Sequence, residues 1–296
     1  MEIAILTRGP GLYSTQSLFK ACLAKGHEPV LVDYARCSLA LGAEGAQIYY
    51  QDRKFAIPDG VIPRIGATFT QEGSALIRHF EWLKVPTTLM SRSLVQARDK
   101  LHSLQRLSKR GIDVPVTVMA EPQADLGLVE DQVGGYPCIV KALESTHGLG
   151  VRLVHNRQEL QQCLMGYSRE SPFFVQEFIA ESKGEDVRVL VVDGQVVGAM
   201  KRVAQEGEFR SNLHQGGRAY NARLTPLGEA VAIRAAKALG LGVAGVDILE
   251  SNRGPLVLEI NASPGLEGIE KVTGQDISGH IVTYLERLVN AALEEE

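Results

Sequence analysis

The chain has no excess of basic residues. Its 296 residues include 31 Lys and Arg against 35 Asp and Glu, for a formal net charge of −4. Proteins that bind nucleic acid generally carry a basic excess, so the composition argues against a direct nucleic-acid partner. Cysteine is scarce too. The four cysteines form no C-x-x-C pair and lie in apolar or helical segments, which predicts buried, reduced thiols.

A basic leader and a long apolar run are missing from the start of the chain. The first nine residues, MEIAILTRG, hold an apolar run of only four residues. We therefore expect neither a signal peptide nor a membrane span, and we expect a cytoplasmic protein. The length predicts two or more structural units, and 45% hydrophobic with 22% charged residues is ordinary for a globular enzyme.

Familiar catalytic motifs are absent as well. The phosphate-binding pattern G-x-x-x-x-G-K-[ST] does not occur, and the turn TRGPGLYS lacks the G-x-G-x-x-G spacing of a dinucleotide site. No Ser-His-Asp or Cys-His arrangement has a supporting context. His147 and His214 lie near candidate chemistry, but neither has a metal-ligand spacing, so neither is assigned as a ligand.

The first 90 residues alternate strand, helix and strand, which is typical of a small α/β domain with a parallel sheet. A long amphipathic helix is expected next, at 91–111, because its leucines share one stripe. The remaining pattern predicts strands and hairpins at 115–119, 137–154, 173–179, 185–204 and 243–262, with helices near 125–133, 157–166, 225–239 and from about 277.

The hairpin at 243–262 places two carboxylates opposite each other. If Glu250 pairs with Leu256 across the turn SNRGP, then Asp247 faces Glu259, and Gly245 faces Asn261. Opposed like charges destabilise a sheet, so we expect a cation between them. Three oxygen-bearing side chains on one face suit Mg²⁺ or Mn²⁺, and Mg²⁺ usually bridges to phosphates, so a nucleotide is implied. The glycine leaves room for it.

The alternative for this hairpin is a solvated sheet face with a bulge that separates the two acids. The end of the strand in Asn-Ser-Pro-Gly favours a site, because the polar face stops where it would meet a ligand. If the site is real, Asp247→Asn and Glu259→Gln should each abolish turnover. Both should leave the fold intact or slightly more stable, because a repulsion is removed.

Cationic residues supply further candidates for anion binding. Lys141 lies in the apolar strand CIVKAL and needs an anion if it is buried, and the glycine loop 144–150 after it suits a flap over phosphates. The segment 201–218 gathers arginines suited to carboxylate or phosphate capture. The alternatives are a lysine that reaches solvent before an ordinary turn, and a solvated basic loop.

These pieces resemble the ATP-grasp superfamily of carboxylate–amine ligases, and within it the RimK type. The matching stretches occur in order along nearly the whole chain: IPRIGA, ARDKLHSLQRLSKRGIDVPVT, GGYPCIVKALESTHGLGV, VQEFI, FRSNLHQGG, VAGVDILESNRGPLVLEINASPGLEGIE and TGQDI. The resemblance implies an α/β N-terminal domain at 1–93, then α+β ATP-grasp subdomains at 94–180 and 181–296 that clamp ATP between them.

The resemblance also assigns roles by position. It implies nucleotide-binding roles for Lys100, Lys141, Glu177, Phe178, Ile179, Asp186, Arg210, Ser211 and Asn212, with the lysines on phosphates, residues 177–179 at the adenine and Asp186 near the ribose. It implies two Mg²⁺ or Mn²⁺ ions on Asp247, Glu259 and Asn261. Arg202 and Arg210 are the expected catalytic arginines, on the developing oxyanion, and Arg64 is expected to contact an acidic peptide.

The implied activity is ATP-dependent addition of L-glutamate to the C-terminal glutamate of a ribosomal small-subunit protein, through an acylphosphate. Synthesis of free poly-α-glutamate is a further activity of the family, and the family assembles as a homo-oligomer, a tetramer. Two alternatives stay open: the same machinery acting on a cofactor tail or an amino-group carrier protein, and a non-enzymatic nucleotide-sensing module. The linking segments 121–134 and 166–172 depart from the family pattern, which leaves the acceptor open.

Overall fold

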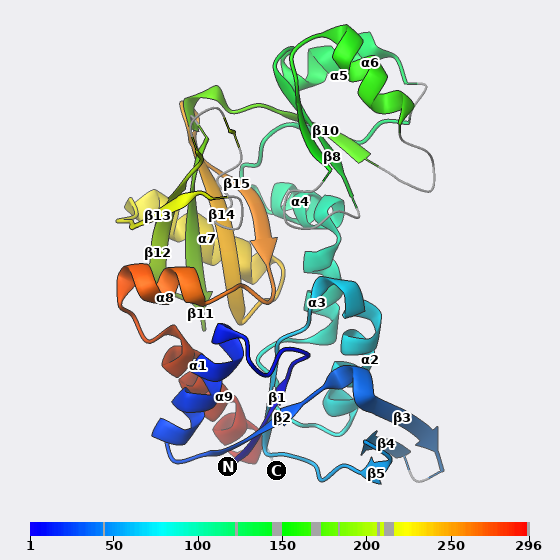
Figure 1. The fold of residues 1–296 in the computed structure, drawn as a ribbon, viewed down its shortest axis with the longest axis vertical. Helices are drawn as coiled ribbons and strands as arrows, with labels where there is room; N and C mark the ends of the chain where they lie inside the picture. Colours follow the sequence, from blue (N-terminus) through cyan, green and yellow to red (C-terminus); the bar gives the residue numbers. More distant parts are fainter. Residues whose placement is uncertain are drawn as a thin grey trace.

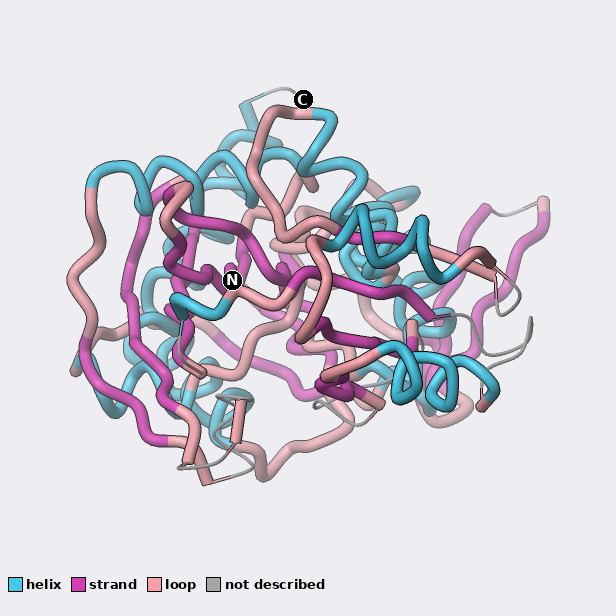
Figure 2. Tube along the Cα trace, turned by 90° about the horizontal axis from the view of Figure 1, so that it is seen from above, coloured by secondary structure: helices cyan, strands magenta, loops and turns pink. Residues whose placement is uncertain are grey.

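The computed structural model describes the whole chain except residues 44, 122–123, 144–149, 167–172, 183, 206–207, 210–215 and 295–296. The described residues form four β-sheets. Along the long axis of the molecule, the N-terminal strands lie at the bottom of Figure 1, the five-stranded sheet lies above them, and the strands within residues 138–177 lie at the top. Viewed along that axis, the strands of different sheets overlap (Figure 2).

The N-terminal part is the expected α/β unit with a parallel sheet. Strands β1 (Glu2–Leu6), β2 (Glu28–Val32) and β6 (Gly60–Pro63) pair in the order β2-β1-β6. Helix α1 (Tyr13–Ala24) connects β1 to β2, and helix α2 (Thr70–Trp82) follows β6. The described residues include three short 3-10 helices: η1 (Tyr34–Arg36), η2 (Ala67–Phe69) and η3 (Ala180–Ser182). Because all three strands are parallel, their carboxyl ends meet at one edge of the sheet.

A small antiparallel sheet between β2 and β6 was not predicted. It consists of β3 (Cys37–Gly42), β4 (Gly45–Tyr50) and β5 (Arg53–Lys54), and it projects to the lower right in Figure 1. Gln51 and Asp52 form the β4–β5 turn with positive φ angles of 51° and 63°. Neither residue is a glycine, so the usual sequence signal for this turn is missing.

The predicted helix at 91–111 is two helices, α3 (Ser91–Arg98) and α4 (Lys100–Lys109). Asp99 separates them with an extended backbone, φ −79° and ψ 102°, and its side chain accepts a hydrogen bond from the His102 amide. Aspartate is a strong helix N-cap, and here it restarts the helix within the leucine stripe. The expectation of one continuous helix was wrong because the leucine periodicity continues through Asp99 and does not reveal an N-cap inside the stripe.

The central sheet is antiparallel, in the order β7-β10-β8-β9. Its strands are β7 (Thr117–Val118), β8 (Cys138–Ala142), β9 (Val151–Val154) and β10 (Phe173–Glu177). Helices α5 (Leu126–Val133) and α6 (Arg157–Met165) pack on it, and together they bury a separate cluster that includes Val140, Leu160 and Val175. We call this unit, with its two helices, the central lobe.

The largest sheet has five antiparallel strands in the order β13-β12-β11-β14-β15. The strands are β11 (Glu185–Val192), β12 (Gln195–Val203), β13 (Arg218–Asn221), β14 (Val243–Ser251) and β15 (Gly254–Asn261). Helices α7 (Pro226–Ala238), capped by Thr225, and α8 (Glu267–Thr273) flank it. The predicted β11–β12 turn is confirmed, since Asp193 and Gly194 both have positive φ.

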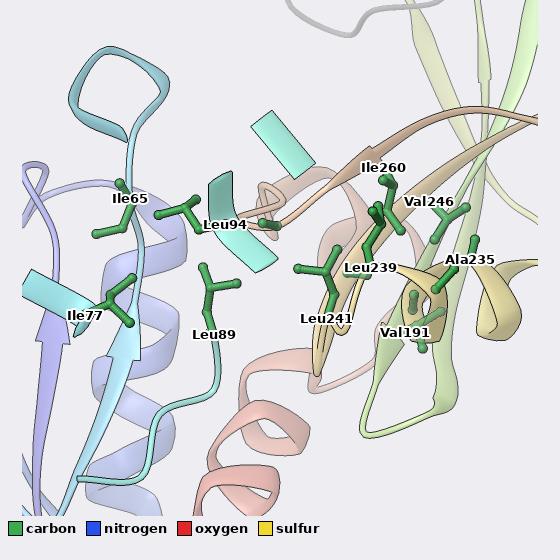
Figure 3. Close-up of a cluster of buried hydrophobic side chains, with 14 of the residues drawn as sticks. Ile65, Ile77, Leu89, Leu94, Val191, Ala235, Leu239, Leu241, Val246 and Ile260 are labelled. Atoms are coloured by element: carbon green, nitrogen blue, oxygen red, sulfur yellow. The ribbon is translucent and has the colours of Figure 1, made fainter. Parts of the chain in front are cut away.

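The N-terminal unit and the five-stranded sheet share one hydrophobic core. Figure 3 shows Ile65, Leu89 and Leu94 beside Leu241 and Ile260. The C-terminal helix α9 (Ile277–Glu294) packs against α1, at the lower left of Figure 1. Its side chains join a second cluster with residues of β1 and β6. These two units therefore form one body, and the central lobe has a core of its own.

The predicted fold class, an α/β N-terminal domain before an α+β module of two subdomains, is confirmed. The boundaries 1–93, 94–180 and 181–296 remain a proposal, supported by the fact that each range holds its own sheets. Helix α9 crosses this division, because it covers the N-terminal sheet. Among the described residues, no helix combines the length and apolar character that crossing a membrane requires.

Candidate active site

The predicted cross-strand pairs of the β14–β15 hairpin are confirmed. Asp247 faces Glu259 and Gly245 faces Asn261. The premise about the turn was wrong, however. Glu250 pairs with Pro255, and only Asn252 and Arg253 join the two strands. Counted away from the turn, the register is constant as far as the pair of Ile248 with Val257 and then shifts by one residue. A β-bulge at position 258 thus restores the pairing that the longer predicted turn would have produced.

The space beside Gly245 is already filled by protein. A Cβ atom built at this position would lie 2.7 Å from Cβ of Pro264, which follows the strand end. The glycine therefore lets the chain after β15 fold back against β14. The expectation that it leaves room for a nucleotide was wrong, because the backbone after Asn261 returns to the same sheet.

Asp247 is not left to face Glu259 without compensation. Its side chain is 3% exposed and accepts two hydrogen bonds from Arg188, both at 2.7 Å, and one from Arg202 at 2.8 Å. Burial alone would raise the pKa of this carboxyl, but the two guanidiniums outweigh it and lower the pKa to about 2. Arginine thus compensates the charge of Asp247 in the structure, whereas the sequence predicted a divalent ion between the two carboxylates.

Arg202 belongs to the same charge ladder. It faces Asp186 across β11–β12 and donates to both carboxylate oxygens, at 2.6 and 2.7 Å, within a buried pair. Burial acts to lower the pKa of Arg202, but Asp247 and Asp186 reverse that and raise it. Asp186 is thus a buried partner of Arg202.

Glu259 and Asn261 lie on the open side of this ladder. Glu259 is exposed and Asn261 is half-buried. Glu259 has no hydrogen bond to another residue in the described part of the chain. Its charge instead raises the pKa values of Lys141, Lys100 and Arg98 against the lowering effect of their burial. A free carboxylate therefore faces three cations from other elements.

Lys141, on β8, is held by a relay from two neighbouring strands. Its Nζ donates to Oε1 of Gln176 at 2.6 Å, and the Gln176 amide donates to Thr117 Oγ1 at 2.8 Å. The Thr117 hydroxyl in turn donates to the Pro115 carbonyl. This order fixes the amide of Gln176 with its oxygen toward the lysine. Burial lowers the pKa of Lys141 to about 8.

Lys100 is the first residue of α4, and it reaches the end of the same strand. Its Nζ donates to the carbonyl of Leu143 at 2.8 Å, and burial lowers its pKa. The N-cap at Asp99 sets the direction in which α4 begins, and so aims this lysine at β8. The structure therefore brings together both predicted phosphate lysines, which are 41 positions apart in the sequence.

The predicted adenine-binding residues 177–179 lie where β10 ends. Glu177 accepts hydrogen bonds from the Val116 amide at 3.1 Å and from Arg253 at 2.6 Å. Phe178 is half-buried and Ile179 is buried. Arg253 belongs to the β14–β15 turn, so this strand end joins the central lobe to the five-stranded sheet.

Other predicted residues lie outside the described part of the chain. These are Arg210, Ser211 and Asn212, together with the glycine loop 144–149 and the two histidines discussed above. Of the two arginines expected to be catalytic, the structure therefore places Arg202. Two site residues were missed, Arg188 and Gln176. Each is a polar residue within an apolar strand, and that was the available signal.

The donor set at the hairpin fits a divalent cation. In the described residues, no three His, Cys, Asp or Glu side chains gather in a metal-binding cluster, and this set has two carboxylates and an amide. A carboxylate has about four lone-pair positions. Arg188 and Arg202 take three on Asp247, so one remains, on Oδ1, and Glu259 and Asn261 are accessible.

Comparison with known proteins agrees with this arrangement. A RimK pre-ATP-grasp domain model matches residues 1–94, and a RimK-like ATP-grasp domain model matches residues 97–285. A protein of Trichodesmium erythraeum named "Probable alpha-L-glutamate ligase" is 46% identical over 288 residues, which cover 97% of this chain and 96% of that protein. One of the same name from Vibrio cholerae is 45% identical over 293 residues, 99% of this chain and 97% of the relative.

Solved structures share the fold. The ATP-grasp ligase PsnB in complex with a minimal precursor superposes with a TM-score of 0.75 at 25% identity, covering 97% of this chain and 98% of PsnB. A RimK domain protein from Sphaerobacter thermophilus has a TM-score of 0.70 at 24% identity, over 96% and 99% of the two chains. The chain belongs to the RimK-like ATP-grasp family and is an ATP-dependent ligase.

Proposed function

We propose that this protein is a ligase that adds L-glutamate to the C-terminal glutamate of a ribosomal small-subunit protein, with poly-α-glutamate as a further product. One observation carries the proposal: Lys141 and Lys100 from one side, and Asp247 and Glu259 from another sheet, converge on one site. Opposed sets of cations and carboxylates suit a nucleotide held with a divalent ion. The names of the relatives support glutamate as the amino acid added.

The nucleotide would lie between the central lobe and the five-stranded sheet. Lys141 and Lys100 would bind its phosphates, and Glu177, Phe178 and Ile179 would receive the adenine where β10 ends. Arg210, Ser211 and Asn212 would supply the second contacting stretch. Asp186 would lie near the ribose. Arg202 would hold it in position, because both carboxylate oxygens of Asp186 accept hydrogen bonds from that arginine.

Asp247, Glu259 and Asn261 would hold two Mg²⁺ or Mn²⁺ ions. PsnB, the structural relative, is known in complex with Mg and ADP. A divalent ion bound here would neutralise negative charge on the phosphates during transfer. Arg188 keeps Asp247 ionised and fixes the direction of its remaining lone pair, so its role is to position that ligand.

The proposed reaction has two steps and uses no covalent nucleophile from the protein. The acceptor carboxylate attacks the γ-phosphorus of ATP, the bond to the bridging oxygen breaks, and an acylphosphate and ADP form. The amine of glutamate then attacks the acyl carbon, phosphate leaves with its oxygen, and an amide forms with loss of a proton. The side chains contribute positioning and charge stabilisation. Arg202 and Arg210 are the proposed stabilisers of the developing oxyanion.

The acceptor is proposed to be an acidic peptide tail. PsnB is described with its precursor peptide, and the macrocyclase MdnC from Microcystis aeruginosa with the precursor MdnA, so relatives of this fold bind peptides. We also propose a homotetramer in the cytoplasm. All four cysteines are free and three are buried, which fits a reducing compartment.

Intact-mass spectrometry tests the function. Purified protein is incubated with ATP, Mg²⁺, L-glutamate and a small-subunit protein whose tail ends in glutamate, and parallel reactions contain a cofactor acceptor or an amino-group carrier protein. We expect glutamate-sized mass increments on the ribosomal protein. Increments confined to a cofactor or carrier would refute the ribosomal acceptor, and ADP release that needs no amino acid would refute the ligase.

A further inference from the structure

Two arginines meet where the N-terminal sheet faces the five-stranded sheet. Arg64 directly follows β6, and its Nη2 donates to the Pro264 carbonyl at 2.5 Å. Arg98 ends α3, and its Nη2 donates to the Ile65 carbonyl at 2.5 Å. Ile65 follows Arg64 and Pro264 follows Ser263, so these bonds place both guanidiniums and the serine in one neighbourhood.

Two polar atoms in this neighbourhood lack a partner. Nε of Arg98 and Oγ of Ser263 are buried and make no hydrogen bond. Most buried polar atoms in folded proteins are hydrogen-bonded, so an unpaired one marks a place where a ligand or another group belongs. The N–H donor comes from the end of α3 and the hydroxyl from the chain after β15.

The electrostatics of the cluster call for an anion. Burial and the neighbouring charge of Arg98 together lower the pKa of Arg64 to about 10, with Glu270 acting in opposition. Burial also lowers the pKa of Arg98, and the charge of Glu259 offsets this lowering only in part. Two crowded guanidiniums, neither of which has a carboxylate bound to it in the described part of the chain, are unfavourable unless negative charge is added.

The position of the cluster is typical of a ligand site. Arg64 lies at the carboxyl end of β6, and ligands of open α/β sheets bind at that edge. Ser263 is two residues beyond Asn261, a proposed metal ligand, so the cluster borders the proposed site of phosphoryl transfer. Arg64 and Ser263 come from the chain after β6 and after β15, whereas the lysines come from the central lobe and α4.

We propose that Arg64, Arg98 and Ser263 form a carboxylate-binding site for a substrate of the ligase. The inference rests on the proposed function, in which both joined molecules carry carboxylates beyond the one that reacts. Guanidinium groups bind a planar carboxylate in a two-pronged manner, and a hydroxyl can donate the third hydrogen bond. The carboxylate belongs either to the incoming glutamate or to the acidic acceptor tail, and separate measurements distinguish the two.

Direct binding tests the site without turnover. Calorimetry with ADP and Mg²⁺ present measures the affinity of L-glutamate and, separately, of tri-glutamate for wild type, Arg98→Lys and Ser263→Ala. We expect one of the two ligands to bind at least tenfold more weakly to both variants, which identifies the source of the carboxylate. Arg92→Ala, an exposed position on the same helix, is the matched control and should bind like wild type.

Unchanged affinity for both ligands in variants that retain the wild-type Tm would overturn the site, as would no binding of either ligand to wild type. The outcome is separable from that of the proposed function. Variants with unchanged affinity in a protein that still adds glutamate by mass spectrometry would refute only the site. Binding that weakens in the variants of a protein that never adds glutamate would refute only the function.

Discussion

The two facing carboxylates have different environments, and this changes what their removal should do. Asp247 compensates two guanidiniums in a buried network, whereas Glu259 is exposed. We expect Asp247→Asn to lower the free energy of unfolding by roughly 3 kcal/mol, because it leaves buried cations under-compensated. Glu259→Gln should leave it nearly unchanged, and both variants should lose turnover. This replaces the expectation from sequence that neither change would destabilise the fold.

Urea denaturation of the two variants, beside wild type, measures this difference. Glu250→Gln, on the exposed part of the same hairpin, is the control. Equal stability of Asp247→Asn and Glu259→Gln would mean that the arginine ladder contributes nothing to folding. Retained turnover in either variant would show that the substituted residue is not an essential metal ligand.

Lys141 makes nucleotide binding depend on pH. Its pKa of about 8 lies below that of a free lysine, because burial disfavours the charged form. A bound phosphate favours the ammonium and raises the pKa again. Above pH 8, ATP binding should therefore take up a proton, and affinity should fall as the pH rises toward 10. Calorimetry at pH 9 in two buffers of different ionisation enthalpy measures the uptake.

The sign for stability follows from the same shift. The unfolded chain, with its higher lysine pKa, binds more protons between pH 8 and about 10.5, so this group makes the nucleotide-free protein more stable as the pH rises through that window. Lys141→Arg should abolish the proton uptake, since arginine stays charged. Identical uptake in this variant would assign the proton to another group.

Gln176 should matter for nucleotide affinity although it is only 1% exposed. Its amide aims Lys141 through the relay from Thr117. We expect Gln176→Leu to weaken nucleotide binding about tenfold, which corresponds to the loss of ~1.4 kcal/mol of orientation. Gln162→Leu, on an exposed face of α6, should bind normally. Equal nucleotide affinities of the two variants would show that the lysine needs no such support.

At the scale of elements, Asp99 decides where α4 begins and thus where Lys100 points. Its carboxylate accepts from the His102 amide at 2.9 Å. Asp99→Ala should lower the free energy of unfolding by about 1 kcal/mol, the usual effect of removing an N-cap, and Asp99→Asn should retain most of it. Thermal denaturation of both variants checks this, and an alanine variant as stable as wild type would rule out the cap.

The sequence predicted the site better than the elements around it. The pairing of Asp247 with Glu259 was predicted from a five-residue turn, and it holds because the bulge at position 258 offsets the shorter turn. The bulge at position 258 could not be foreseen, since apolar alternation tolerates one extra residue. The β3–β5 sheet was missed for a related reason: its turn uses Gln51 and Asp52, which lack the glycine that usually signals a hairpin.

Contacts between distant segments were beyond prediction from the sequence. Arg188 and Gln176 are ordinary polar residues until folding sets them against Asp247 and Lys141. The same holds for Ser263 and Arg98, which are far apart in the sequence. Their unpaired atoms are visible only once the chain is packed.

At the scale of the whole molecule, the central lobe has a core separate from the rest. Its attachments are local, such as the pair between Arg253 and Glu177 and the hydrogen bond from Lys100 to Leu143. We expect two unfolding transitions. Val175→Ala should lower the Tm of the central lobe alone, and Val246→Ala should lower the Tm of the larger body alone. Differential scanning calorimetry resolves them, and a single transition shifted by both variants would show one cooperative unit.

Helix α9 adds a constraint on how the chain is made. It covers apolar residues of β1, α1 and β6, which are the first parts of the protein to be translated. Those surfaces stay exposed to solvent until nearly the whole chain has emerged from the ribosome. Nascent chains halted before residue 277 should therefore recruit chaperones. Removing the last turns of α9 should first destabilise the N-terminal elements that it covers.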